Sequence, residues 1–265
     1  MSRSNYYKQR KRRLTEKPSE IEKTVIKCFC DHNGNYGRIR IQKALEFKGI
    51  RISQFQIRKI LLKHDLIAKS GRRKKHHIDK PTEKQYIEEN LIYNKTDVTQ
   101  INYLWCSDIT ELTCARNVKL FLCCVIDVAS RRIVGSVIGR NQTKDLVMNA
   151  FRMAVGRNPK RPGGAIFHSD RGCQFTSKDM KALVESCGFR KSMSRPGTPH
   201  DNQPIESFWR TLEVEMPDIR HLNFEDASRS IIRYIELYYN PVRLHSSLNY
   251  LSPNTFFSLS SVLFS

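Results

Sequence analysis

The first seventy residues alternate apolar positions at helical spacing with short polar turns. Three such stretches span residues 18–33, 37–47 and 53–64. The third begins with Ser53-x-x-Gln56, the sequence of a helix capping box. The pattern predicts three short helices and therefore a small all-α domain over residues 18–68. We expect its interior to contain Ile21, Val25, Ile26, Phe29, Ile39, Ile41, Ala44, Leu45, Phe55, Ile57, Ile60 and Leu61.

A helix, a Gly-containing turn and a basic helix in succession are typical of a helix-turn-helix. The third helix would then be the recognition helix. Its polar residues that we expect to face DNA are Gln54, Gln56, Arg58 and Lys59. An ordinary three-helix core without DNA contacts is the alternative interpretation.

The pattern changes after residue 100, where short apolar runs typical of strands begin. Strands are expected at 103–112, 120–128, 133–138, 165–168 and 189–193, with helices at 144–155 and 177–187 and further helices after residue 200. Residues 120–128 are almost wholly apolar, so this strand should be central in the sheet. The order predicts an α/β domain over residues 101–258, with a mixed five-stranded sheet flanked by helices and a helical C-terminal tail. This order is similar to that of the ribonuclease H-like fold.

Charge divides the chain in the same way. Its 46 Lys and Arg against 26 Asp and Glu give a net charge of +20, and residues 1–80 alone have a net charge of +16. Such an excess favours a polyanion as partner, above all nucleic acid, over a solvated basic extension. We assign residues 1–17 to a basic arm and residues 69–100 to a basic and polar linker. The basic run of the linker, which either is only solvated or follows a phosphate backbone, contains Arg72, Arg73, Lys74 and Lys75.

Composition also excludes several classes of protein. Hydrophobic residues make up 39%, which is enough for a packed core, and no apolar run is long enough to cross a membrane. The N-terminal sequence is unlike a secretory signal. Several of the eight cysteines lie in apolar runs, which favours buried reduced thiols and a cytoplasmic location.

Three carboxylates lie at or near the ends of the expected elements. Asp108 lies in the first strand, Asp170 follows the fourth, and Glu206 begins a helix after Pro204. Asn202 or Asp201 is the expected cap of that helix. Any one such acid is more often a solvated surface group. Together beside a central sheet, the three would repel one another unless cations neutralised them. Oxygen ligands favour two Mg²⁺ ions, or Mn²⁺, and such a pair supports in-line displacement at phosphorus.

Between Asp170 and Glu206 lie 35 residues, and the chain resembles a known family at this interval and at many other motifs. It resembles the downstream-frame (OrfB) transposases of the IS-three family of bacterial insertion sequences, which are related to retroviral integrases. The residues that carry the resemblance are Asn35-Tyr36-Gly37-Arg38, Trp105 to Thr110, Val125-Ile126-Asp127, Ser130-Arg131, His168 to Ser177, Ser192 to Arg195, Asp201-Asn202, Ile205 to Phe208, Tyr239 to Leu248 and Tyr250 to Pro253.

The resemblance implies a DNA transposase that cleaves insertion-sequence ends and joins the freed 3′-hydroxyl to another strand. It implies that Asp108, Asp170 and Glu206 are both the catalytic triad and the metal ligands. Double-stranded DNA, further copies of the chain on DNA and the upstream-frame (OrfA) product are the implied partners, and the bacterial nucleoid is the implied location. A DNA-binding regulator with weakened catalysis and a nuclease that cleaves without joining remain as alternatives.

Other charged residues near these motifs have less certain roles. Arg171 and Arg195 are expected to contact DNA, and Arg210, four residues after Glu206, is expected either to pair with it or to contact a phosphate. Glu213 stands where the family often has a basic residue, so it should weaken the binding of DNA ends. We interpret Asp127 as structural or as a group that supports the metal ligands without binding the metal. In the tail, which contains Arg243 and His245, we favour bracing of the catalytic helix by Arg243 over DNA contact and assign no role to His245.

Overall fold

The structure is a computed structural model that describes residues 18–69, 88–92, 98–194 and 202–263. The chain forms two compact units, Met1–Arg72 and Arg73–Ser265. The N-terminal arm, the basic run from Arg72 to Lys75, Asp201 and Arg195 lie outside the described residues.

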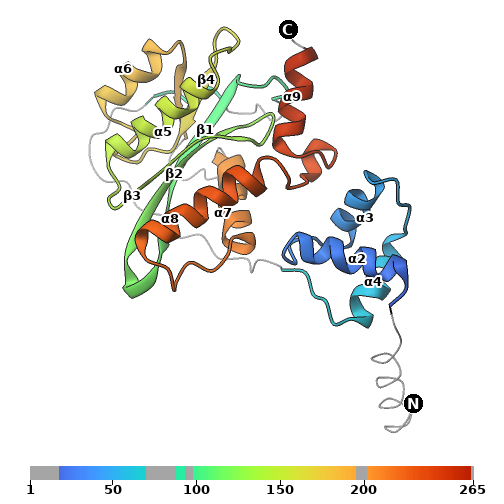
Figure 1. Cartoon of the computed structure of the whole chain (residues 1–265). Coiled ribbons are helices and arrows are strands. Elements are labelled where there is room, and N and C mark those ends of the chain that lie inside the picture. The colour runs from blue at the N-terminus through green and yellow to red at the C-terminus, as the bar shows by residue number, and fades with distance from the viewer. Residues whose placement is uncertain (1–17, 70–87, 93–97, 195–201, 264–265) are drawn as a thin grey trace. The chain divides into compact units, whose positions relative to one another are not determined.

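The described residues of the smaller unit form three helices, α2 (Glu20–Asp31), α3 (Arg38–Glu46) and α4 (Gln54–Lys63) (Figure 1). Ser19 and Ser53 cap α2 and α4, and both caps are complete capping boxes. Its core contains Val25, Cys28, Phe29, Tyr36, Ile41, Leu45, Ile52, Ile57, Ile60 and Leu61.

The interior predicted for this unit is wrong at three positions. Ile21, Ile39 and Phe55 are exposed, Phe55 by 75%. Each helix is only 9 to 12 residues long and contributes two or three buried side chains. A stripe this narrow leaves apolar residues at the edge of the helical face in solvent.

The larger unit contains the predicted mixed sheet of five strands, in the order β3-β2-β1-β4-β5. The strands β1 and β2 pair antiparallel, as do β2 and β3, whereas β1 with β4 and β4 with β5 are parallel. Their bounds are β1 Leu104–Thr113, β2 Lys119–Asp127, β3 Ile133–Gly139, β4 Ile166–Ser169 and β5 Arg190–Met193.

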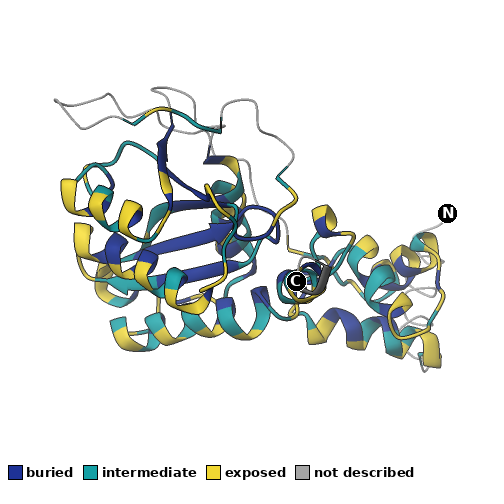
Figure 2. Cartoon of the chain, turned by 90° about the horizontal axis from the view of Figure 1, so that it is seen from above, coloured by how far each residue is buried: buried dark blue, intermediate teal, exposed yellow. Residues whose placement is uncertain are grey.

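Helices cover both faces of this sheet, and in Figure 2 the strands are dark blue between helices whose outer sides are yellow. On one face, α5 (Lys144–Arg157) and α6 (Lys178–Ser186) pack on Trp105, Cys123 and Phe167. The helix α5 lies so close to β3 that a Cβ added at Gly135 would come 2.3 Å from the Ala150 carbonyl oxygen.

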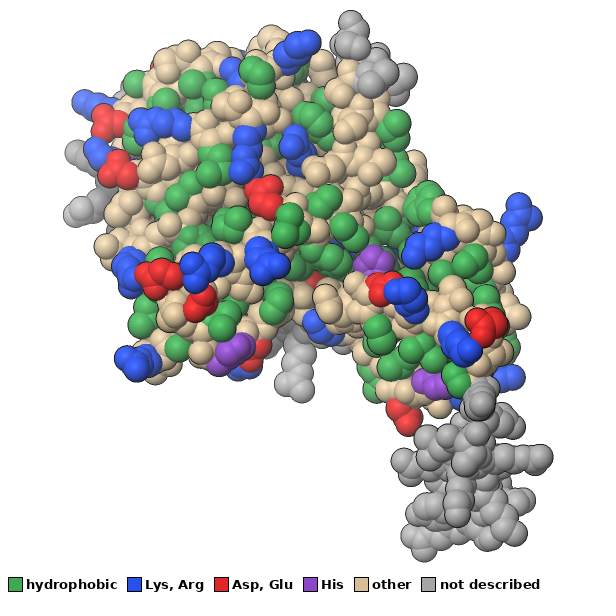
Figure 3. Space-filling model, in the orientation of Figure 1, with side chains coloured by type: hydrophobic (Ala, Val, Ile, Leu, Met, Phe, Trp, Pro, Cys, Tyr) green, Lys and Arg blue, Asp and Glu red, His purple; other side chains and the backbone are tan. Residues whose placement is uncertain are grey.

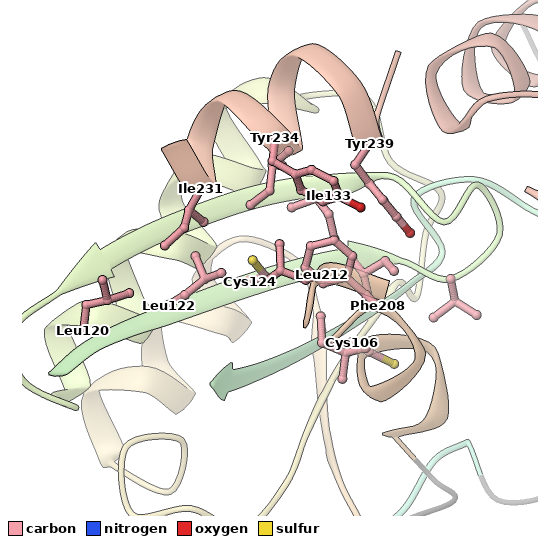
Figure 4. Packing of buried hydrophobic residues seen from close by; sticks show 14 of the residues in the cluster. Cys106, Leu120, Leu122, Cys124, Ile133, Phe208, Leu212, Ile231, Tyr234 and Tyr239 are labelled. Atoms are coloured by element: carbon pink, nitrogen blue, oxygen red, sulfur yellow. The ribbon is translucent and has the colours of Figure 1, made fainter. Parts of the chain in front are cut away.

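The opposite face carries α7 (Gln203–Glu215), α8 (Phe224–Arg233) and a π-helical turn, Tyr234–Tyr239. In Figure 4, Phe208 and Leu212 of α7, with Ile231 and Tyr239, pack in one cluster with Leu122 and Cys124 of β2 and Cys106 of β1. The chain then continues to α9 (Pro253–Leu263). The two packed faces fix β1 in the middle of the unit.

Residues 88–92, part of the predicted linker, run beside β5. The Met193 N–H donates to the Glu89 carbonyl at 3.4 Å, and the Leu91 N–H donates to Ser192 Oγ at 3.0 Å. Glu88 forms an ion pair with Lys181 of α6 at 2.6 Å. The end of the linker therefore covers the edge strand, which would otherwise expose unpaired backbone groups. In the described part of the chain, no helix has the length and apolar character needed to span a membrane.

Candidate active site

The sheet brings Asp108 and Asp170 together. Strands β1 and β4 are parallel neighbours in which Ser107 is paired with Ser169. Asp108 directly follows Ser107, and Asp170 directly follows Ser169. Strand alternation places Asp108 on the same face as Leu104 and Cys106, which pack toward α7.

The third acid, Glu206, lies in the first turn of α7. Asn202 is the N-cap residue of this helix, as expected, but its side chain makes no capping hydrogen bond. Its Nδ2 instead donates to the Ser107 carbonyl of β1 at 3.3 Å, next to Asp108. This bond attaches the beginning of α7 to the strand that carries the first aspartate.

The charges of the other two acids act on Asp108. Burial raises the pKa of Asp108 to about 7, and the charges of Asp170 and Glu206 contribute to that rise. Burial also raises the pKa of Asp170, although the Gly172 N–H donates to its Oδ1 at 3.0 Å and favours the ionised form. All three side chains keep partial exposure. A cation from solvent can therefore reach them.

A tryptophan of α7 contacts the first aspartate directly. The Nε1–H of Trp209 donates to Asp108 Oδ2 at 2.8 Å. Nothing in the spacing of the acids predicted this bond, although Trp209 lies three residues after Glu206, where side chains share one face of a helix.

The loop that carries Asp170 is fixed from β5. His168 is fully buried, and its two ring nitrogens lie 2.9 Å from Ser192 Oγ and Ser194 Oγ. Arg171 donates through Nε to the Ser194 carbonyl at 2.7 Å. The two serines therefore hold residues on both sides of Asp170.

The basic residue predicted to pair with Glu206 lies close to it. Arg210 Nη2 is 3.8 Å from Glu206 Oε2, and the Arg210 side chain is 64% exposed. Exposed pairs of this kind contribute little to stability, so Arg210 can turn toward another anion at small cost. Glu213, one turn further along α7, is exposed.

Two residues interpreted as structural have structural contacts. Asp127 is fully buried at the end of β2, where it accepts hydrogen bonds from the backbone N–H groups of Asn102 and Ser130 and from the Ser130 hydroxyl. Arg243 forms a bidentate pair with Glu215, the last residue of α7, at 2.7 Å for both bonds. Both partners are almost fully buried. Arg243 thus braces α7, as expected. His245, the other tail residue, bonds through Nδ1 to Ser247 Oγ at 2.9 Å.

The carboxylates offer a set of donors that fits a hard cation. In the part of the chain that the structure describes, no group of three or more His, Cys, Asp or Glu is close enough to hold a metal as it stands. The three neighbouring acids nevertheless provide only oxygen ligands, which Mg²⁺ and Mn²⁺ prefer. Such an ion would neutralise the negative charges of these acids. The residues present therefore fit a divalent cation.

On the smaller unit, two of the four residues expected to face DNA are engaged within the fold. Gln54 Nε2 donates to Gln42 of α3 at 3.1 Å, and Gln56 Oε1 accepts the Ser53 N–H at 3.1 Å in the capping box. Arg58 and Lys59 are exposed. In Figure 3, Lys and Arg side chains are spread over the visible face of each unit.

The sheet topology and the neighbouring acids define the class of protein, an integrase-type catalytic core. Two family profiles, both described as integrase core domain, match residues 98–199 and 187–253. The chain belongs to the transposases of bacterial insertion sequences of the IS3 family, and it is a DNA transposase of the polynucleotidyl transferase type.

Similar proteins match over nearly their whole length. The transposase for insertion sequence element IS904 of Lactococcus lactis subsp. lactis is 36% identical over 239 residues, 89% of this chain and 93% of that protein. The insertion element IS600 uncharacterized 31 kDa protein of Shigella sonnei is 32% identical over 97% of this chain and 94% of that protein. The transposase InsF for insertion sequence IS3A of Escherichia coli K12 is 31% identical over 97% and 90%.

Among solved structures, a chain of the simian T-cell lymphotropic virus intasome in complex with PP2A regulatory subunit B56 gamma is 15% identical with a TM-score of 0.47, covering 81% of this chain and 69% of that chain. The HTLV-2 integrase catalytic core domain, solved with magnesium, is 16% identical with a TM-score of 0.43, covering 59% of this chain and 97% of that chain.

Proposed function

We propose that Asp108, Asp170 and Glu206 are the catalytic residues of this transposase and that they bind its divalent cations. The observation that carries the proposal is the convergence of the three acids. Asp108 and Asp170 come from the adjacent parallel strands β1 and β4, and Glu206 comes from α7, which Asn202 attaches to β1. The charges of Asp170 and Glu206 also act on Asp108. Two Mg²⁺ ions, or Mn²⁺, would activate the attacking water or 3′-hydroxyl and stabilise the leaving oxygen. Asp127 has no part in this chemistry, because its hydrogen bonds hold a buried turn.

The protein groups around the carboxylates orient the reactants. Arg171, held through its Nε, keeps the outer nitrogens of its guanidinium available for a phosphate. The exposed side chain of Arg210 would reach a DNA phosphate once its weak pair with Glu206 opens. Arg195 lies near the same motifs in the sequence. All three would hold the DNA backbone near the acids.

We also propose that the smaller unit is a helix-turn-helix domain whose α4 binds double-stranded DNA. Arg58 and Lys59 carry its basic face, and the run from Arg72 to Lys75 would follow the phosphate backbone. Gln54 and Gln56 do not act as free base readers in this proposal, because other groups of the unit already bind them. Joining two element ends requires several copies of the chain on DNA, with the upstream-frame product as an additional partner.

One assay tests the catalytic proposal against its alternatives. Labelled insertion-sequence end DNA is incubated with the full chain and Mg²⁺, beside the variant Asp170→Ala. Joined products are expected with the unchanged chain and none with the variant. Cleavage without joining would indicate a nuclease, binding without either reaction would indicate a regulator, and full activity of Asp170→Ala would disprove the site assignment.

A further inference from the structure

The side chain of Trp209, in α7, donates a hydrogen bond to one of the two aspartates of the site. Its Nε1–H and Asp108 Oδ2 are 2.8 Å apart, although the two residues are 101 positions apart in the chain. The indole also packs against the core on the α7 face, with its ring 5.1 Å from that of Phe208. Packing therefore fixes the ring that carries the donor.

The chemistry of indole suits a contact with a metal-binding carboxylate. An indole nitrogen donates one hydrogen bond and accepts none, so it cannot compete with the carboxylate for a cation. The indole is also neutral, so it leaves the negative charge of the carboxylate for the cation, whereas a Lys or Arg side chain would neutralise that charge. Without a cation, the charges of Asp170 and Glu206 act against Asp108. The N–H of Trp209 opposes that repulsion by holding one oxygen of Asp108.

The position of Trp209 gives this bond a second effect. Glu206 and Trp209 lie three residues apart and share one face of α7, so the bond also fixes the helix that carries Glu206 relative to β1. Asn202 makes a second link to β1 at Ser107, and Arg243 holds the far end of α7 through Glu215. Of these links, only that of Trp209 reaches a carboxylate of the site.

We propose that Trp209 is a positioning residue that preorganises the cation site by fixing both the Asp108 carboxylate and the α7 helix. The inference rests on the proposed cation site and adds a residue to it. Groups that orient metal ligands in this way change metal affinity by about 10- to 100-fold when they are removed. We therefore expect the loss of the indole N–H to weaken Mg²⁺ binding about tenfold.

The chain provides a matched control, because it contains only two tryptophans. Trp105 lies on β1, the strand of Asp108, and is fully buried among the aromatic rings of Phe151 and Phe189, and its Nε1 has no hydrogen-bond partner in the described residues. Trp105→Phe and Trp209→Phe are thus the same chemical change, and only the second removes a bond to Asp108.

The test measures Mg²⁺ binding to the full chain by titration calorimetry in four proteins: unchanged, Trp105→Phe, Trp209→Phe and Asp108→Asn. We expect equal affinity in the first two, about tenfold weaker binding in Trp209→Phe and none in Asp108→Asn. Equal affinity of Trp209→Phe and Trp105→Phe, with binding lost in Asp108→Asn, would overturn the role of Trp209 alone. Absence of binding by the unchanged chain, or unaltered binding by Asp108→Asn, would overturn the proposed cation site and this inference with it.

Two further measurements do not depend on affinity alone. In Trp105→Phe the only remaining indole is Trp209, whose fluorescence should shift when Mg²⁺ binds, whereas Trp105 in Trp209→Phe should not respond. Raising Mg²⁺ should restore strand joining in Trp209→Phe but not in Asp108→Asn. A Trp209 fluorescence that ignores saturating Mg²⁺, or a joining defect that Mg²⁺ does not relieve, would contradict the proposal.

Discussion

Replacing Asp108 by Asn should stabilise the cation-free protein at neutral pH. The repulsion among the three acids is a cost of the folded state, since the unfolded chain separates them. The pKa of Asp108 is raised by burial and by Asp170 and Glu206 from 3.8 to about 7, so the folded state binds a proton more tightly than the unfolded state. Stability contributed by Asp108 is therefore lost as the pH rises from about 4 to about 7. Asn at this position carries no charge and keeps an oxygen that can accept the Trp209 bond.

The size of the effect follows from the same shift. At about 1.4 kcal/mol per pKa unit, the full shift corresponds to about 4 kcal/mol. Because the side chain is partly exposed, solvent screening reduces the expected gain to about 2 kcal/mol. For a chain of this size, about 2 kcal/mol corresponds to a rise in Tm of about 4–8 °C at pH 8.

Urea unfolding from pH 4 to pH 8 in the absence of divalent cations measures this difference. We expect the two proteins to be equally stable at pH 4 and Asp108→Asn to be the more stable at pH 8. Glu111→Gln, which removes an exposed carboxylate from the same strand, should follow the unchanged chain. Added Mg²⁺ should stabilise the unchanged chain and not Asp108→Asn. A pH dependence of Asp108→Asn identical to that of the unchanged chain would refute the idea that the acids repel one another in the fold.

Three other changes test separate parts of the molecule. Arg243→Met should destabilise the fold by about 3–5 kcal/mol in urea unfolding, because it leaves Glu215 buried without its partner; a loss below about 1 kcal/mol would show that α7 needs no brace. Glu213→Lys should tighten binding of end DNA about two- to fivefold at low salt in a mobility-shift titration, since an exposed repulsion becomes an attraction; unchanged or weaker binding contradicts this. Arg58→Ala with Lys59→Ala should reduce the slope of log binding constant against log salt by about 2 for duplex DNA, and an unaltered slope would place the phosphate contacts elsewhere.

The elements of the larger unit could be predicted closely because their hydrophobic pattern is unambiguous. Every expected strand of the sheet is present within two residues of its predicted bounds. Residues 120–128 were expected in the centre because nearly all are apolar, and β2 lies between β3 and β1. The apolar runs identify the strands here because helices cover both faces of the sheet.

In the smaller unit, the hydrophobic and polar pattern of the sequence did not predict the structure correctly. Phe55 has the spacing and the chemistry of a core residue, yet three short helices bury too little surface to enclose it. Gln54 looks like a base reader in the sequence because its partner, Gln42, has no distinguishing pattern, whereas the Ser53-x-x-Gln56 capping box that binds Gln56 is visible in the sequence. Hydrogen bonds between side chains of different elements depend on tertiary geometry that composition does not encode.

The same limit applies at the active site. The three acids could be proposed from their positions and from the family resemblance: Asp108 lies within β1, Asp170 directly follows β4 and Glu206 lies in the first turn of α7. The bonds that orient them could not, since Trp209 and Asp108 are 101 residues apart and nothing in either segment indicates the other. His168, which stands two residues before Asp170, gave no sign of its serine partners, because those partners come from a strand that follows a helix.

Strand joining by variants of the three acids tests the central claim most directly. Asp108→Asn, Asp170→Asn and Glu206→Gln each remove one negative charge with almost no change in shape, and Glu111→Gln makes the same change on the exposed part of β1. With labelled end DNA and Mg²⁺, joined product should form with the unchanged chain and with Glu111→Gln, and should be absent with each of the three variants. Joined product at the unchanged rate from any one of the three would contradict the assignment of that residue to the catalytic triad.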